Sequence, residues 1–293
     1  MNKILVIIVT YNGMQWIERC INSVLESSVP ADIYVVDNGS TDGTQNFIRD
    51  HYDNVIFHQS NLNLGFGRAN NIGFKYAIEN NYDYLYLLNQ DAWIEKFTFE
   101  ILIASHRENP QYGVISPLQC NASETRFDNN FYCNCLSNAI VYNHLKKTCQ
   151  PTDLYECDFV MAAHWLISRN CVLHVGGFSP SFPHYGEDNN FIHRCLFHGF
   201  KVGISFNTFG IHDREYRVEA KSKVLYMQYI DSIINISNPI EKRFSISKYC
   251  ESVLKYVVKY KSFIPFLYLF KFLKRKRDFL DNKEKSIEGC AFL

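Results

Sequence analysis

Residues 4–9 form a continuous apolar run, and this run constrains the fold most because a strand so apolar has to be buried on both faces. Shorter apolar runs follow at 33–36, 55–57 and 84–88. Segments with apolar residues at helical spacing lie between them, at 14–27, 41–52 and 68–80. Strands that alternate with helices predict βαβ units and a mostly parallel sheet. We expect Ser40 or Thr41 to be the N-cap of the helix over 41–52.

The second part of the chain has a looser pattern. After a short apolar run at 114–116, residues 120–150 are polar and predict a loop-rich insertion. Helices are predicted at 169–175 and 187–199, with a strand at 201–206. From about residue 216 the pattern is helical throughout. With 293 residues, of which 47% are apolar and 20% charged, the chain is a globular protein rather than a disordered one.

The N-terminal and cysteine patterns indicate a cytoplasmic protein. Thr10, Tyr11 and Asn12 directly follow the first apolar run, so we do not expect a signal peptide there. The ten cysteines show no repeated metal-binding spacing, and we expect reduced thiols. Residues 263–273 are the best candidate for a membrane span, but the stretch is short and Lys271 interrupts it.

Polar residues follow three of the predicted strands and precede the third helix. Ligands bind outside the carboxyl ends of the strands in open parallel sheets, so these segments predict one ligand-binding crevice. Each segment alone could be only a turn or a helix cap. Gly65 and Gly67 could belong to a dinucleotide fingerprint, although Asn70 stands where its third glycine would be. The segments are 10–12, 37–44, 63–71 and 89–92.

In this order the segments resemble family 2 glycosyltransferases, most closely their rhamnosyltransferase-like branch. The motifs are Val9-Thr10-Tyr11-Asn12, Asp37-Asn38-Gly39-Ser40-Thr41-Asp42, Asn63-Leu64-Gly65-Phe66-Gly67 with Asn70-Asn71-x-Gly73, and Leu88-Asn89-Gln90-Asp91-Ala92. Residues 158–163 and 175–178 resemble the acceptor-side segment, and Glu187-Asp188 followed by Arg194 and Gly199 resembles the catalytic segment. The similarity covers about residues 3–213.

The resemblance implies an α/β GT-A fold, with a Rossmann-like, mostly parallel sheet flanked by helices. We place this domain at 1–214, with a nucleotide-sugar-binding half at 1–92 and an acceptor-binding half at 93–214. A helical, basic C-terminal extension follows at 215–293.

The resemblance also implies roles for the residues of the donor site. Asp37 would contact the base, and the remaining donor-binding residues would be Thr10, Tyr11, Asn12, Gly39, Gly65, Gly67, Arg68, Asn71 and Asn89. Asp91 would bind Mg²⁺ or Mn²⁺, because a hard cation stabilises the charge that develops on a leaving diphosphate. Asn89 stands where many relatives carry the first Asp of a D-x-D motif. His212 could be a second metal or phosphate ligand, or only a structural residue.

By the same resemblance, Asp188 would be the general base and Glu187 would orient Asp188 or the acceptor. A single base opposite the leaving group implies inversion of configuration. Two acids in a first helical turn could also only complement the helix dipole. Trp165 could stack on a sugar or lie in the core.

The predicted activity is metal-dependent, inverting hexosyl transfer to an acceptor hydroxyl of a growing, lipid-linked surface glycan. The donor could be dTDP-rhamnose or a UDP-hexose. A catalytically inactive nucleotide- or glycan-binding module is the alternative. A nucleotide-sugar oxidoreductase or a nucleotidyltransferase is disfavoured, because the third glycine and a leading glycine-rich loop are missing.

Charge is distributed unevenly along the chain. Residues 242–277 contain eleven Lys or Arg against the single acid Glu251, while the whole chain has a net charge of zero. A segment of net charge +10 predicts an acidic partner. We favour the anionic surface of the inner face of a membrane, with a packed helical pair as the alternative. Nucleic acid is disfavoured because no binding motif accompanies the charge.

Overall fold

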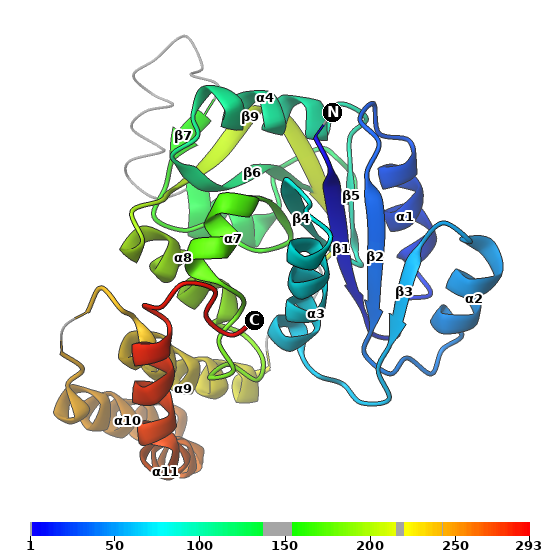
Figure 1. Ribbon diagram of the computed structural model, residues 1–293. Helices are drawn as coiled ribbons and strands as arrows, with labels where there is room; N and C mark the ends of the chain where they lie inside the picture. The colour runs from blue at the N-terminus through cyan, green and yellow to red at the C-terminus, as the bar shows by residue number, and fades with distance from the viewer. Residues whose placement is uncertain (1, 137–153, 215–219, 242) are drawn as a thin grey trace.

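The computed structural model describes residues 2–136, 154–214, 220–241 and 243–293. One mixed sheet, flanked by helices on both faces, forms the centre of the molecule (Figure 1). Its strand order is β3-β2-β1-β4-β8-β6-β9-β5, and β7 pairs with β9 outside this path. The strands are β1 (Ile4–Thr10), β2 (Asp32–Asp37), β3 (Ile56–Gln59), β4 (Tyr84–Asn89), β5 (Ala92–Ile94), β6 (Tyr112–Asn121), β7 (Leu154–Glu156), β8 (His164–Ser168) and β9 (Lys201–His212).

In the first half of the chain the helices alternate with the strands, and the last three helices follow one another at the C-terminus. The sheet-flanking helices are α1 (Ile17–Leu25), α2 (Thr44–His51), α3 (Phe66–Glu79), α4 (Thr98–Glu108), α7 (Arg169–Val175) and α8 (Glu187–Phe197). A short helix α5 (Asn129–Phe131) continues into a π-helical turn at Tyr132–Leu136. The C-terminal helices are α9 (Lys221–Ser237), α10 (Ile246–Tyr260) and α11 (Ile264–Lys285).

Strand β1 is buried on both faces, as its apolar sequence predicts. Leu5 and Ile7 belong to the hydrophobic core that includes residues of α3, α7 and α8. Val6 and Ile8 belong to the core on the other face, with residues of α1 and α4. Successive side chains of a strand point to opposite faces, so both covering layers depend on this one strand. The predicted α/β fold with a mostly parallel first half is thereby confirmed.

Beyond β4 the sheet differs from the predicted pattern. Strand β8 pairs antiparallel with both β4 and β6, and β5 and β7 pair antiparallel with β9. Strand β9 extends to His212, six residues past the predicted end. Trp165 lies on β8 and is fully buried against Phe178, so the prediction of a core tryptophan is confirmed and sugar stacking is excluded.

Two other predictions need correction or fall outside the structure. The N-cap of α2 is Gly43, not Ser40 or Thr41, because the helix begins only at Thr44 and the Ser40 hydroxyl is bonded to Asp37. The carboxylate of Asp42 accepts a hydrogen bond from the Thr44 amide at 3.1 Å, at the first residue of the helix. Of the predicted insertion at 120–150, residues 120–136 are described and contain the end of β6, α5 and the π-helical turn, whereas 137–150 lie outside the described residues.

The three C-terminal helices form a separate layer beneath α8 (Figure 1). Their shared core contains Tyr229, Tyr249, Val253, Phe272 and Phe279, and Phe182 joins it from the loop before α8. The last residues return to the sheet domain, where the Ala291 carbonyl accepts a hydrogen bond from the Gly177 amide at 2.8 Å. Within the described part of the chain, none of the helices is long and apolar enough to cross a membrane.

Candidate active site

The carboxyl ends of β1 and β4 are joined through Gln90. Its Oε1 atom accepts hydrogen bonds from the Thr10 hydroxyl at 2.7 Å and the Tyr11 amide at 2.9 Å. Its Nε2 atom donates to the Tyr11 carbonyl at 3.2 Å. Thr10 is fully buried, whereas the Tyr11 side chain is 47% exposed, so of this predicted pair only the Tyr11 ring is open to a ligand.

The loop after β2 is held together by Asp37. This buried carboxylate accepts hydrogen bonds from the Gly39 and Ser40 amides at 3.0 Å and from Gln45 Nε2 at 2.7 Å. Gly39 has a φ of +82°, which glycine adopts without strain. The loop's own donors surround Asp37, so a contact between this carboxylate and a base requires Ser40 or Gln45 to turn away. Gln45 takes part in this hydrogen-bond network, although no sequence motif pointed to it.

Asn12 connects the first loop to the second. Its amide donates to Ser40 Oγ at 2.9 Å, and its Oδ1 atom accepts from the Thr41 amide at 2.8 Å. Its φ of 50° lies in the left-handed region, which asparagine tolerates better than most residues. The predicted 10–12 and 37–44 segments therefore do meet at one edge of the sheet.

The N-terminus of α3 approaches the N-terminus of α8 through two glycines. A Cβ on Gly65 would lie 2.6 Å from the Pro183 carbonyl oxygen, and one on Gly67 would lie 2.9 Å from Phe178 Cβ. The Gly67 position is also 3.7 Å from Glu187 Cβ. These glycines thus allow the donor half and the catalytic helix to touch. The neighbouring Arg68 is exposed.

Asn71, one of the predicted donor-binding residues, has its side-chain amide bound to the second half of the chain. Its Nδ2 atom donates to the Phe178 carbonyl at 2.9 Å and to the Phe292 carbonyl at 3.4 Å. Its Oδ1 atom accepts from the Phe178 amide at 2.7 Å. With its amide used in this way, Asn71 joins α3 to the second half of the chain and to the C-terminal segment.

Asp91 and His212 lie together, as a metal site would require. The two residues flank the β5–β9 pairing, and the Asp213 amide donates to the Asp91 carbonyl at 2.8 Å. His212 Nε2 is 3.4 Å from both Asp91 Oδ1 and Asn89 Nδ2. Both side chains are buried, and His212 Nδ1 has no hydrogen-bond partner among the residues that the structure describes.

This donor set fits a divalent cation that is completed by other ligands. Among the described residues there is no group of three or more His, Cys, Asp or Glu that could hold a metal. A carboxylate and an imidazole would supply two ligands, and a diphosphate or water would supply the others. The imidazole favours Mn²⁺ over Mg²⁺, because Mg²⁺ prefers oxygen ligands throughout.

A buried ion pair that the sequence did not reveal borders this site. Arg214 donates to Asp128 through Nε at 3.0 Å and through Nη2 at 2.7 Å. Burial pushes the pKa of Asp128 upward, but the hydrogen bonds and charge of Arg214 outweigh it and hold the pKa below its usual value. Arg214 lies two residues after His212, but no sequence pattern connects it to Asp128, which lies 86 residues earlier in the chain.

The two carboxyls at the start of α8 have different environments. Burial, followed by the charge of Asp188, raises the pKa of Glu187 to about 8, and Glu187 Oε2 has no hydrogen-bond partner within the described part of the chain. Burial also raises the pKa of Asp188, against the opposing effects of Asn189 and of the Arg214 charge. Asp188 is half-buried. Its Oδ1 atom accepts hydrogen bonds from the backbone amide and the Nδ2 atom of Asn189. Glu187 therefore holds a proton at neutral pH, which spares Asp188 a second adjacent negative charge.

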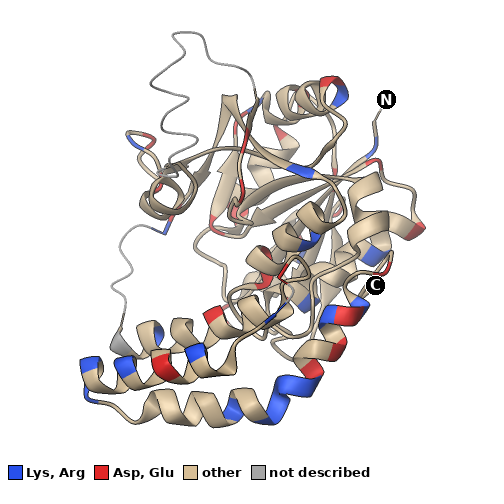
Figure 2. Ribbon diagram, turned by 90° about the vertical axis from the view of Figure 1, so that its left-hand side faces the viewer, with Lys and Arg blue, Asp and Glu red and all other residues tan. Residues whose placement is uncertain are grey.

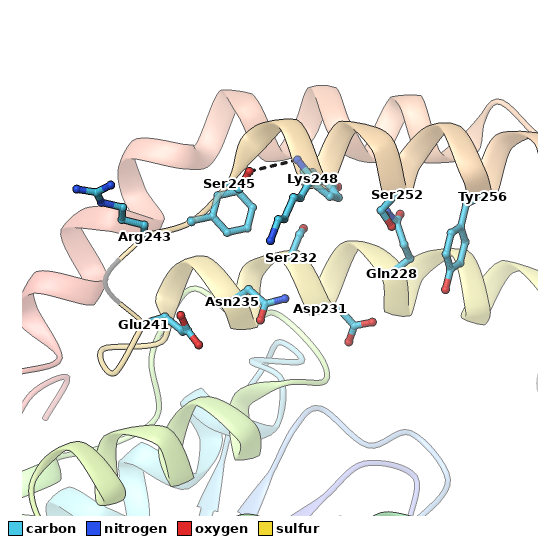
Figure 3. Close-up of a pocket in the computed structure, with 12 residues that line it drawn as sticks. Gln228, Asp231, Ser232, Asn235, Glu241, Arg243, Ser245, Lys248, Ser252 and Tyr256 are labelled. Atoms are coloured by element: carbon cyan, nitrogen blue, oxygen red, sulfur yellow. Dashed lines mark hydrogen bonds between the residues drawn. The ribbon is translucent and has the colours of Figure 1, made fainter.

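A polar cavity of about 370 Å³ lies elsewhere, between α9 and α10 (Figure 3). Its lining includes Gln228, Asp231, Asn235, Lys248 and Tyr256. None of the predicted site residues lines it. The cavity therefore belongs to the helical extension and not to the crevice at the sheet edge.

This fold and site belong to a known class of sugar-transferring enzymes. Residues 5–176, more than half of the chain, match the model of glycosyl transferase family 2. The chain therefore belongs to this family, whose members are glycosyltransferases.

The relatives found by sequence match only part of the chain. The poly-beta-1,6-N-acetyl-D-glucosamine synthase of Staphylococcus epidermidis (strain RP62A) is 29% identical over 109 residues. A second sequence of the same name from this species is 28% identical over 109 residues. In both cases the match covers 36% of this chain and 26% of the relative, so this chain spans about a quarter of the length of these relatives.

Solved structures with the same fold include those of S. aureus TarS 1-349. The structure of TarS alone has a TM-score of 0.57 at 15% identity, and it covers 97% of this chain and 81% of TarS. The complex with UDP has a TM-score of 0.55 at 16% identity, covering 94% and 72% of the two chains. The complex with UDP-GlcNAc has a TM-score of 0.54 at 14% identity, covering 84% and 69%. This likeness confirms the predicted GT-A fold.

Proposed function

We propose that this chain is an inverting glycosyltransferase that moves a hexose unit from a UDP-sugar to an acceptor hydroxyl. The observation that carries the proposal is that the helix beginning with Glu187 and Asp188 packs against the donor half of the chain at Gly67. Asp91 and its partner His212 lie at the carboxyl end of the sheet.

Asp188 is the proposed base. Its carboxylate takes the proton of the acceptor hydroxyl as that oxygen bonds to the anomeric carbon, while the bond from this carbon to the diphosphate breaks. A raised pKa makes a carboxylate a stronger base, and burial raises the pKa of Asp188. A protonated Glu187 beside it does not compete for the acceptor proton.

Asp91 and His212 are the proposed ligands of a divalent cation, Mn²⁺ or Mg²⁺. When bound, the cation stabilises the negative charge of the leaving diphosphate. His212 Nε2 lies 3.4 Å from Asp91 Oδ1, so this ring nitrogen is the one positioned to share a cation with Asp91. Asn89 is uncharged and so adds no second negative charge to the cation site. The cation therefore depends on the nucleotide for tight binding.

UDP-N-acetylglucosamine is the donor we favour. The curated relative is named for a poly-N-acetylglucosamine product, and TarS has been crystallised with UDP-GlcNAc. The resemblance of the motifs to the rhamnosyltransferase-like branch keeps dTDP-rhamnose as the second candidate. We propose a lipid-linked surface glycan as the acceptor, at the inner face of a membrane.

A panel of nucleotide sugars tests the proposal. We expect UDP-GlcNAc with Mn²⁺ to raise the unfolding temperature and to be slowly hydrolysed to UDP, because a ligand stabilises the state it binds. EDTA and the Asp91→Ala variant should each remove both effects, whereas Arg107→Ala on the far helix α4 should change neither. Binding without any hydrolysis or transfer would favour an inactive module, and hydrolysis undiminished by EDTA would remove the metal from the mechanism.

A further inference from the structure

The hairpin formed by α10 and α11 exposes a large apolar face near its turn. Val258 is 77% exposed, Phe263 80%, Leu267 69% and Phe270 71%. Phe263, Leu267 and Phe270 follow the spacing of one helical face, and Val258 joins them from the end of α10. Single exposed apolar residues are common, but a group of four this exposed marks an interaction surface.

The packing of the same helices uses their other face. Tyr249 and Val253 of α10 and Phe272 of α11 are buried together, and Tyr268 stacks on Tyr229 of α9. Polar side chains line the cavity that separates α9 from α10, so α10 is held mainly through α11 (Figure 3). The apolar residues near the turn are therefore left over after the helical layer has packed. The two helices do pack into the helical layer, as the alternative prediction for 242–277 required, and these apolar residues remain exposed.

Basic residues surround this apolar face. Between Leu254 and Arg277 the chain has eight Lys or Arg and no Asp or Glu. They lie along α10, at the turn and in the middle of α11 (Figure 2). Two nearby ion pairs, Lys255 with Glu251 at 2.7 Å and Arg275 with Asp278 at 3.8 Å, neutralise only a small part of this charge.

We infer that the α10–α11 turn docks on an anionic lipid bilayer, with its apolar side chains inserted among the acyl chains and its lysines near the headgroups. Lysine stems are long enough to keep their charge at the headgroups while the apolar residues insert. A second copy of this chain fits less well, since the contact would bring eight basic residues against eight others. The occupant that matches both the charge and the apolar face is a membrane surface.

The helical layer ties this surface to the catalytic helix. Gly186, directly before Glu187, leaves room for Ile230 of α9, where a Cβ would come within 2.8 Å of Ile230 Cγ2. Asn190 Nδ2 of α8 donates to the Ser237 carbonyl at 3.2 Å, and the Tyr226 hydroxyl donates to the His184 carbonyl at 3.2 Å. A bilayer bound at the turn would therefore lie at a set position relative to Asp188. The inference concerns where the enzyme works and does not depend on which sugar it transfers.

Vesicle co-sedimentation of the full chain tests this inference. We expect binding to vesicles of phosphatidylcholine mixed with phosphatidylglycerol at low salt, and release as salt screens the charges. The variant Phe263→Ser/Leu267→Ser/Phe270→Ser should partition about tenfold or more weakly, since it loses most of the inserted apolar area. The variant Lys271→Glu/Lys274→Glu/Arg277→Glu should lose the preference for anionic over neutral vesicles.

Matched control changes lie at the opposite end of the molecule. Phe97 is 54% exposed just before α4 and Arg107 is exposed on α4, so Phe97→Ser/Arg107→Glu should bind vesicles like the wild type. Circular dichroism and donor hydrolysis should be unchanged in all variants, which separates this inference from the proposed activity. Equal binding to neutral and anionic vesicles, or binding to neither, would overturn it. So would a concentration-dependent dimer that the serine variant abolishes.

Discussion

At the scale of single residues, the neighbours Glu187 and Asp188 show how environment divides two carboxyls into different roles. Glu187 is almost fully buried and keeps its proton at neutral pH, whereas Asp188 is half-buried and lies within the field of Arg214. The sequence predicted the pair and the base, but it could not predict the proton on Glu187. That proton depends on packing by α3 and α9, which come from distant parts of the chain.

Replacing the proposed base tests its role directly. Asp188→Asn keeps the shape of the side chain and removes its basicity. We expect turnover to fall by about 10²–10⁴, the usual contribution of a general base, with little change in donor affinity. Steady-state kinetics and donor titration would measure both quantities. Transfer at a near wild-type rate by the Asn variant would show that another group accepts the proton.

The pKa of Glu187 leads to a prediction about stability. Its pKa is raised from 4.5 to about 8, so the folded state holds a proton that the unfolded state releases. Where the folded state binds more protons, stability falls as the pH rises, here from about 4.5 to 8 and by up to about 1.4 kcal/mol per pH unit. Glu187→Gln cannot lose a proton there. We therefore expect its unfolding temperature to exceed that of the wild type increasingly between these pH values.

The control for this comparison is Glu100→Gln in the exposed part of α4, which should follow the wild-type curve at every pH. A constant difference between wild type and Glu187→Gln across the range would contradict a titration at Glu187.

At the scale of elements, the sequence predicted the first half of the fold well because its strands are buried on both faces and alternate with amphipathic helices. The later strands were harder to predict. Strands β5 and β7 have three residues each, and β8 begins with His164, whose polarity hides a buried strand. Its imidazole is satisfied by the Tyr86 hydroxyl and the Ile211 carbonyl at 3.0 Å each. Long-range partners of this kind leave no local pattern.

Arg194 shows the same limit for a helix. The motif match suggested a catalytic neighbourhood, but this arginine is fully buried and joins α8 to the end of α7. It donates to the Val175 carbonyl at 2.7 Å and to the Gly177 carbonyl, and its guanidinium lies 5.2 Å from the Phe292 ring centre. Burial lowers its pKa to about 10, so it remains charged at neutral pH. Arg194 thus serves as the C-terminal cap of α7.

Removing these donors should destabilise the protein. Arg194→Met keeps much of the side-chain volume and leaves two buried carbonyls without a partner. We expect the two unpaired carbonyls to lower the free energy of unfolding by about 2–4 kcal/mol. The variant no longer buries the arginine charge, and the free energy that it saves in this way reduces the loss. Urea unfolding would measure it, with the exposed Arg107→Met as the control. Unchanged stability would mean that the cost of burying this charge equals the contribution of its hydrogen bonds.

At the scale of the whole molecule, the C-terminal segment closes the structure by returning from α11 to the sheet domain. The Cys290 amide donates to the Leu173 carbonyl at 3.0 Å, and Ala291 packs against Gly176. The helical pattern after residue 216 predicted the extension but neither the end of α11 at Lys285 nor this return, because the partners Leu173 and Gly176 lie far away in the sequence. The return holds the helical layer, and with it the proposed membrane surface, against α7 and α3.

Two glycines with the same backbone conformation allow the contribution of this contact to be measured. Gly176 and Gly199 both have a φ of +82°. A Cβ on Gly176 would lie 2.0 Å from the Ala291 carbonyl oxygen, whereas a Cβ on Gly199 would meet nothing within 4 Å. Gly199→Ala should therefore lose only the conformational cost of about 1–2 kcal/mol. Gly176→Ala should lose more, because it also displaces the C-terminal segment.

The difference between the two variants in urea unfolding then reports the docking of the C-terminal segment alone. Limited proteolysis should also cleave α9–α11 faster in Gly176→Ala than in Gly199→Ala, since the helical layer loses its second attachment to the sheet domain. Equal losses in both variants would show that the C-terminal segment contributes nothing to stability. In that case the other contacts of the helical layer, those of α9 with α8 and of Asn282 with Ser181, would position it relative to Asp188.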